Sequence, residues 1–94
     1  MVVFEDIVLL DRQDTAKVVR EIGEEELIRA LKAVEDSVRD HIVQSMAQEE
    51  AKALQGKLAQ TGAVRLRDAD AAQQRIVATM RSMEEQGQIA FVRR

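Results

Sequence analysis

Helix-breaking residues are rare in this sequence, and their scarcity constrains the fold more than any other feature. The 94 residues contain no proline and only four glycines, whereas a fold of many short strands needs frequent turns, which these two residue types usually form. Alanine, leucine, glutamate, glutamine, arginine and lysine dominate the chain, and they lose the least free energy on entering an α-helix. The sequence therefore predicts an all-α domain.

Three of the glycines mark where helices should end. Gly23, Gly62 and Gly87 each follow a helical pattern, and glycine is favoured just past a helix because it adopts a left-handed conformation without a Cβ clash. These stops and the spacing of the apolar residues predict about six helices joined by short turns, with Asp14 capping the second. The expected helices cover residues 5–10, 14–22, 24–34, 36–46, 48–61 and 67–86, and an extended segment at 88–92 should pack back on the bundle.

The composition excludes several protein classes. The chain has room for one domain with one core, and it lacks cysteine, which removes disulfides and cysteine-based zinc sites. No apolar stretch approaches the roughly 18 residues of a membrane span, and the N-terminus is apolar then acidic, the reverse of a signal peptide. We therefore expect a cytoplasmic domain that does not insert into a membrane.

Catalytic groups are not visible in the sequence. His41 is the only histidine, and it flanks the apolar face of its predicted helix, where a structural role is expected. Neighbouring glutamates fan around a helix instead of converging on one point, and no glycine-rich phosphate loop occurs. We expect no enzymatic activity, no metal and no cofactor.

Nucleic-acid binding is the weakest alternative. A helix-turn-helix protein could use the arginines around the last helix, at 65, 67, 75 and 81, for phosphate contacts. Acidic residues are interspersed among them, however, and the formal net charge is −3. Nucleic-acid binders normally carry an excess of basic residues, so we expect no nucleic-acid partner.

Seven short segments, in order, resemble a known family. Together they are similar to the C-terminal domain of FliG, the rotor protein of the bacterial flagellar switch complex, over nearly the whole chain. The resemblance implies a compact, armadillo-related bundle of six helices. The matching segments are Phe4-Glu5-Asp6-Ile7, Leu10-Asp11, Arg20-Glu21-Ile22, Ala30-Leu31-Lys32, Gly62-Ala63-Val64-Arg65-Leu66, Ala71-Ala72-Gln73-Gln74-Arg75-Ile76 and Glu84-Glu85-Gln86-Gly87-Gln88-Ile89.

The resemblance also implies a hinge at the N-terminus. In the family, a Met-Phe-x-Phe segment reorients the bundle when rotation reverses, and Met1-Val2-Val3-Phe4 matches it except at Val2. Residues 1–4 are accordingly expected to be a hinge remnant and residues 5–94 the helical domain. The alternative is a plain apolar segment that docks on the bundle, and both can hold, because an apolar hinge needs two packing modes of similar energy.

Four surface charges are implied to meet the stator. Lys32 and Arg65 keep the sign of the family's basic positions, whereas Glu49 replaces a basic residue. Where the family has two acidic residues, this chain has Gly56 and Lys57. Three of these five positions have thus lost or reversed the expected charge, and two keep it.

The implied function is that of a stator-facing rotor domain that takes part in torque generation and rotation switching. The implied partners are the cytoplasmic loop of the stator protein MotA and, through the N-terminal and middle FliG domains missing here, the switch-complex proteins FliM and FliF. The implied location is the flagellar basal body at the cytoplasmic face of the inner membrane. A FliG-like scaffold or regulatory domain without a motor role is the alternative, and the chain would be either an excised fragment or a stand-alone relative.

Overall fold

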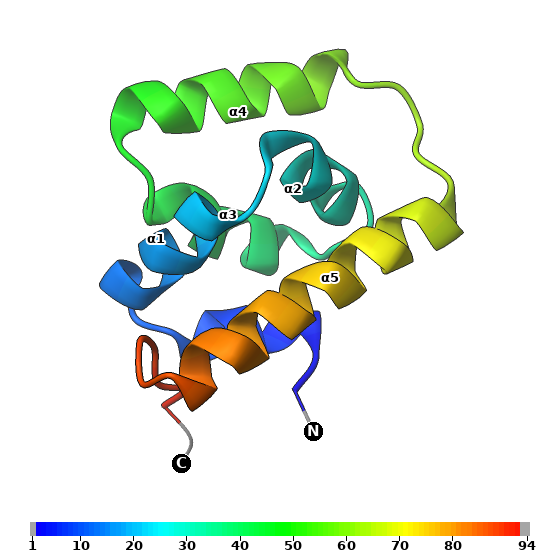
Figure 1. Cartoon of the computed structure of the whole chain (residues 1–94). Coiled ribbons are helices and arrows are strands. Elements are labelled where there is room, and N and C mark those ends of the chain that lie inside the picture. The colour runs from blue at the N-terminus through cyan, green and yellow to red at the C-terminus, as the bar shows by residue number, and fades with distance from the viewer. Residues whose placement is uncertain (1, 93–94) are drawn as a thin grey trace.

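Helices make up all the regular structure of residues 2–92, which are the residues that the computed structural model describes (Figure 1). The all-α fold class and the expected number of helices are confirmed. In chain order, the elements are a 3-10 helix η1 (Phe4–Leu9) and the α-helices α1 (Arg12–Glu21), α2 (Glu24–Leu31), α3 (Asp36–Gln44), α4 (Gln48–Gln60) and α5 (Leu66–Glu85).

Helix α1 begins earlier than the sequence predicted. Its cap is Asp11, whose side chain accepts a hydrogen bond from the backbone N–H of Asp14 at 2.7 Å. The prediction that Asp14 caps this helix was wrong, because an acidic residue three positions upstream satisfies the first free N–H groups instead. Asp14 binds the C-terminal segment of the chain, since its carboxylate accepts the backbone N–H of Ala90 at 3.0 Å.

Only one of the three glycines ends its helix in the expected way. Gly87 has a φ of 75°, the only positive φ among the described residues, and the N–H of the next residue, Gln88, bonds to the carbonyl of Met83 at 2.9 Å. Gly23 is instead an extended residue that caps the start of α2. Gly62 does not have a positive φ either, so the carbonyls at the end of α4 need other partners.

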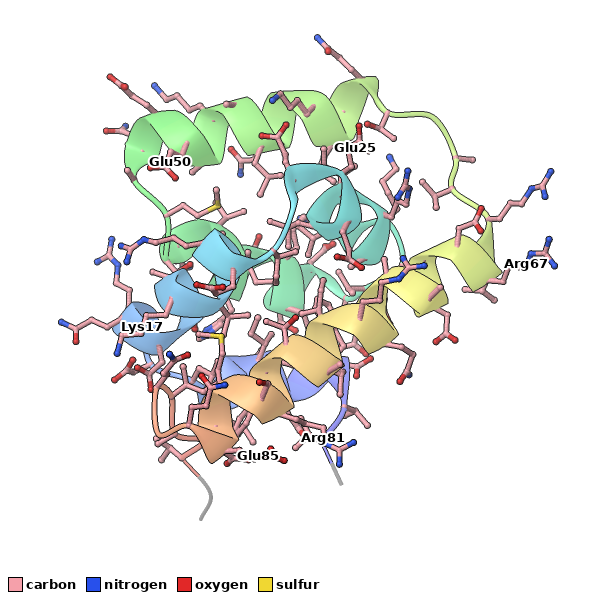
Figure 2. The ribbon with its side chains drawn as sticks, viewed as in Figure 1. Lys17, Glu25, Glu50, Arg67, Arg81 and Glu85 are labelled. Carbon is pink, nitrogen blue, oxygen red and sulfur yellow. The ribbon has the colours of Figure 1, made fainter. Side chains whose placement is uncertain are left out.

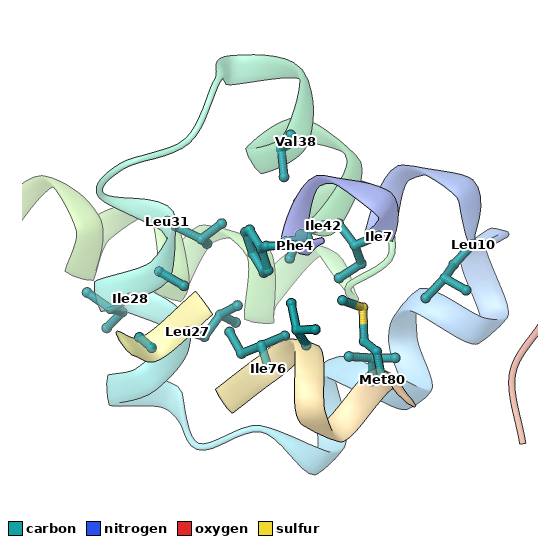
Figure 3. Close-up of a cluster of buried hydrophobic side chains, with 14 of the residues drawn as sticks. Phe4, Ile7, Leu10, Leu27, Ile28, Leu31, Val38, Ile42, Ile76 and Met80 are labelled. Atoms are coloured by element: carbon teal, nitrogen blue, oxygen red, sulfur yellow. The ribbon is translucent and has the colours of Figure 1, made fainter. Parts of the chain in front are cut away.

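The longest helix, α5, crosses the bundle and supplies much of its core (Figure 1). Its buried face includes the apolar stripe that the helical spacing predicted, at residues 69, 72, 76, 80 and 83. Side chains of η1, α2 and α3 pack against that stripe, among them Phe4, Ile7, Leu27 and Ile42 (Figure 3). The core is therefore built almost entirely from aliphatic residues around one phenylalanine.

The C-terminal segment packs back on the bundle as predicted. Ile89 is buried, and the N–H of Val92 donates to the carbonyl of Leu9 at 3.0 Å. The ammonium group of Lys17 donates to the carbonyl of Gln88 at 3.2 Å. These contacts join the end of the chain to η1 and α1. None of the helices formed by residues 2–92 combines the length and apolarity that crossing a membrane requires.

Candidate functional site

Helix α4 lies along one side of the molecule and carries two of the four predicted site residues (Figure 1). Glu49 is in its first turn and Lys57 in its last, about 12 Å apart along the helix axis. Lys32 is the C-terminal cap residue of α2, and Arg65 is the residue just before α5. All four residues are exposed. The structure brings Lys32 and Lys57 to the C-terminal end of α4 and leaves Glu49 at its other end.

Lys32 bonds within the domain. Its ammonium group donates to the carbonyl of Leu58 at 3.1 Å and to that of Thr61 at 2.9 Å. The last carbonyls of a helix have no partner inside the helix and carry its partial negative charge. The positive charge of Lys32 therefore stabilises the end of α4.

Lys57 also has an intramolecular partner. Its ammonium group pairs with the carboxylate of Glu24, in the first turn of α2. Both side chains are about half exposed, so the pair is solvated and contributes little to stability. The sequence indicated only that the neighbouring glutamates at the start of α2 fan around the helix, and it did not predict this ion pair, because 33 positions separate the two residues and no local pattern relates them.

Glu49 and Arg65 differ from the two lysines. Neither side chain forms an ion pair or hydrogen bond with another residue in the range 2–92. Gly56 lies within α4, and an added Cβ would meet nothing within 4 Å. The free charges of the predicted site are therefore one acidic and one basic side chain at opposite ends of the segment from α4 to α5.

The predicted hinge segment enters the core. The Phe4 ring is 2% exposed, Val2 packs against the same cluster, and Val3 is exposed. The N–H of Val3 donates to the carboxylate of Asp6 at 3.1 Å, which fixes the start of η1. Met1 lies outside the described residues. In this conformation, Phe4 is part of the hydrophobic core.

His41 contacts the one buried polar side chain of the described residues, Thr15. The Thr15 hydroxyl donates to the carbonyl of Asp11 at 2.7 Å, so its oxygen accepts from the Nε2–H of His41 at 3.0 Å. We assign this tautomer from the hydrogen-bond network. The structural role expected for His41 agrees with this contact, which ties α3 to the start of α1.

Thr15→Val is expected to lower the free energy of unfolding by about 1–2 kcal/mol. The substitution nearly keeps the volume, but it removes the hydrogen bonds of a fully buried hydroxyl and leaves the Nε2–H of the partly buried His41 without its acceptor, a loss of about this size. Thr79→Val is the matched control, because the hydroxyl of Thr79 makes only an exposed bond to the carbonyl of Arg75 within α5. Urea denaturation measures both, and equal effects of the two substitutions would contradict the role given to Thr15.

The other features that might support chemistry are dispersed. A hollow of about 490 Å³ lies between α1, α3 and α4, and the residues that line it include Leu10, His41 and Met46. His41 is already hydrogen-bonded to Thr15. Within residues 2–92, no three histidine or acidic side chains come together as a metal site would require. Figure 2 shows Arg67 and Arg81 at opposite ends of α5, about 21 Å apart, so the arginines of this helix do not form one concentrated basic patch.

Comparison with known proteins gives consistent matches. The family model for the FliG C-terminal domain matches residues 1–91. The flagellar motor switch protein FliG of Borreliella burgdorferi is 42% identical over 93 residues, which are 99% of this chain and 27% of that protein. The FliG of Thermotoga maritima is 39% identical over 93 residues, which are 99% of this chain and 28% of that protein.

A solved structure agrees with these relatives. The crystal structure of Helicobacter pylori FliG, residues 116–343, superposes with a TM-score of 0.90 at 30% identity, covering 95% of this chain and 39% of that one. The chain spans only 27–28% of the length of the two relatives above. Those relatives are named as motor switch proteins and not as enzymes, which agrees with the expectation from sequence. Matched over nearly its whole length, the chain belongs to the family of FliG C-terminal domains.

Proposed function

We propose that this chain is the stator-facing rotor domain of a flagellar motor switch complex, taking part in torque generation and in rotation switching. The observation that carries the proposal is the family match over residues 1–91, together with the TM-score of 0.90 against Helicobacter pylori FliG. Its partner would be the cytoplasmic loop of the stator protein MotA. FliM and FliF would bind other domains of the rotor protein, at the cytoplasmic face of the inner membrane.

Exposed charges suit such a contact. A surface ion pair contributes about 0–1 kcal/mol and is screened by salt, so it can guide a rotor toward a stator and then release it at each step. Glu49 and Arg65 are exposed and have no partner in residues 2–92. They are the residues of the predicted site most available to a second protein.

The reversed charges define the stator that this domain would fit. Glu49 and Lys57 carry signs opposite to those that the family resemblance implies for their positions. Like charges brought together would repel, so a matching stator would carry the exchanged signs. Residues 1–4 would act as the hinge, with Phe4 released from the core when the domain reorients.

A scaffold or regulatory domain without a motor role is the second candidate. The intramolecular bonds of Lys32 and Lys57 favour it, because they satisfy two of the four predicted stator charges inside the domain. Such a domain would bind another helical protein through a different face.

A domain exchange tests the proposal. This chain would replace the C-terminal domain of FliG in a motile bacterium, beside a version with Glu49→Arg and Lys57→Asp, and flagellation and swimming would be scored. Lys57 pairs with Glu24, so Lys57→Asp would place the new carboxylate beside that of Glu24, and the two would repel each other. The corrected version therefore also carries Glu24→Gln. Glu24→Gln alone is the matched control.

We expect both versions to assemble filaments and only the corrected version to restore swimming. That outcome means a motor domain adapted to a stator of different charge. If filaments assemble and neither version swims, the surface for torque is absent and the scaffold becomes the better explanation.

A further inference from the structure

The C-terminal end of α4 is capped by a side chain from outside the helix, that of Lys32 at the end of α2. The residue after the helix, Thr61, is extended with φ −73° and ψ 128°, and Gly62 does not have the positive φ of a glycine cap. Thr61 satisfies only the carbonyl of Lys57, to which its backbone N–H donates at 2.9 Å and its hydroxyl at 2.6 Å.

Lys32 supplies what the local sequence lacks. Its ammonium group, at the end of α2, reaches the Leu58 carbonyl in the last turn of α4 and the Thr61 carbonyl just beyond it. One side chain therefore joins the last turn of α4 to the first residue of the loop that leads to Arg65.

The C-terminal end of α2 is also capped by a side chain from another helix. The side-chain amide of Gln73 in α5 donates to the carbonyls of Ala30 and Ala33 at 3.0 and 3.2 Å, and so caps the end of α2. A side chain of α5 thus caps the end of α2, and the side chain of Lys32, at the end of α2, caps the end of α4. A capping role for Lys32 fits this architecture.

Helix α4 has few other attachments. Its buried side chains in the described structure are Leu54 and Leu58, and it packs mainly against α2. The remaining polar link is the exposed ion pair between Lys57 and Glu24. Leu58 therefore attaches the C-terminal end of α4 to the core, and Lys32 adds the hydrogen bonds that fix its last carbonyls and the residue beyond them.

We propose that Lys32 is a positioning residue, which fixes the end of α4 and the loop before Arg65. The inference rests on the proposed function for the identity of the partner surface. Within that surface it assigns direct contact to Glu49 and Arg65 and an indirect role to Lys32.

Amide hydrogen exchange of this chain without any partner tests the inference. Lys32→Met keeps the apolar stem and removes the ammonium group. We expect the protection of the amides at the end of α4, including that of Thr61, to fall about fivefold, as expected for one net hydrogen bond. The protection of the amides at the centre of α5, around Ile76, should stay within about twofold.

Lys52→Met is the matched control. Lys52 is an exposed lysine of α4 whose side chain has no partner in residues 2–92, so its replacement should leave exchange at the end of α4 unchanged. Unchanged exchange in Lys32→Met, or an equal fall throughout α5, would overturn the inference. Because this readout needs no stator, a fivefold fall would support the positioning role even if the domain exchange failed to restore swimming.

Discussion

Phe4→Ala is expected to lower the free energy of unfolding by about 3–5 kcal/mol, the range for truncating a buried aromatic ring. The ring is 2% exposed and lies in the main core cluster with Ile7 and Ile76. Removing it loses the transfer free energy of the ring and leaves a cavity that its neighbours fill only in part. Because small domains have total stabilities of about 5–15 kcal/mol, urea denaturation followed by circular dichroism would show a large shift of the midpoint.

Val3→Ala is the control for this prediction. Val3 is 44% exposed and precedes Phe4 in the same segment, so its truncation should change the free energy of unfolding by less than about 0.5 kcal/mol. If Phe4→Ala cost less than about 1 kcal/mol, the segment would leave the core at little cost, contrary to the packing described above. Because Phe4 is buried, residues 1–4 can act as a hinge only if they exchange this packing for another of similar energy.

Ile76→Ala is expected to cost about 2–5 kcal/mol, the range for truncating a buried aliphatic side chain to alanine. Ile76 is 0% exposed and lies in the middle of the buried stripe of α5, where side chains from η1 and α2 converge (Figure 3). The exact cost depends on how far the surrounding helices close the cavity. Urea denaturation measures it from the midpoint, provided that the slope stays unchanged.

Leu66→Ala, on the same helix, is the matched control. Leu66 is 77% exposed, so it buries little apolar surface and its truncation should cost less than about 0.5 kcal/mol. Similar costs at the two positions would mean that α5 does not form the centre of the core. The pair compares a buried and an exposed position of the same helix.

The sequence alone determined the class of the fold, the approximate bounds of the helices and the buried stripe of α5. These features follow from local causes: helix propensity, the spacing of apolar side chains and the scarcity of proline and glycine. The seven matching segments likewise carried the family assignment. Helix caps were less certain even locally, because Asp11 and Asp14 are both good capping residues and only one of them can start α1.

Only the tertiary structure decided what the charged residues of the candidate site do. Lys32 and Lys57 are exposed lysines in the sequence pattern, yet one caps α4 and the other pairs with Glu24. Gly62 has the position of a helix-ending glycine, but it does not adopt a positive φ. The ammonium group of Lys32 donates to the carbonyl of Leu58 instead. Such contacts join residues 26 to 33 positions apart, and their geometry is set by how the helices pack, which no local periodicity encodes.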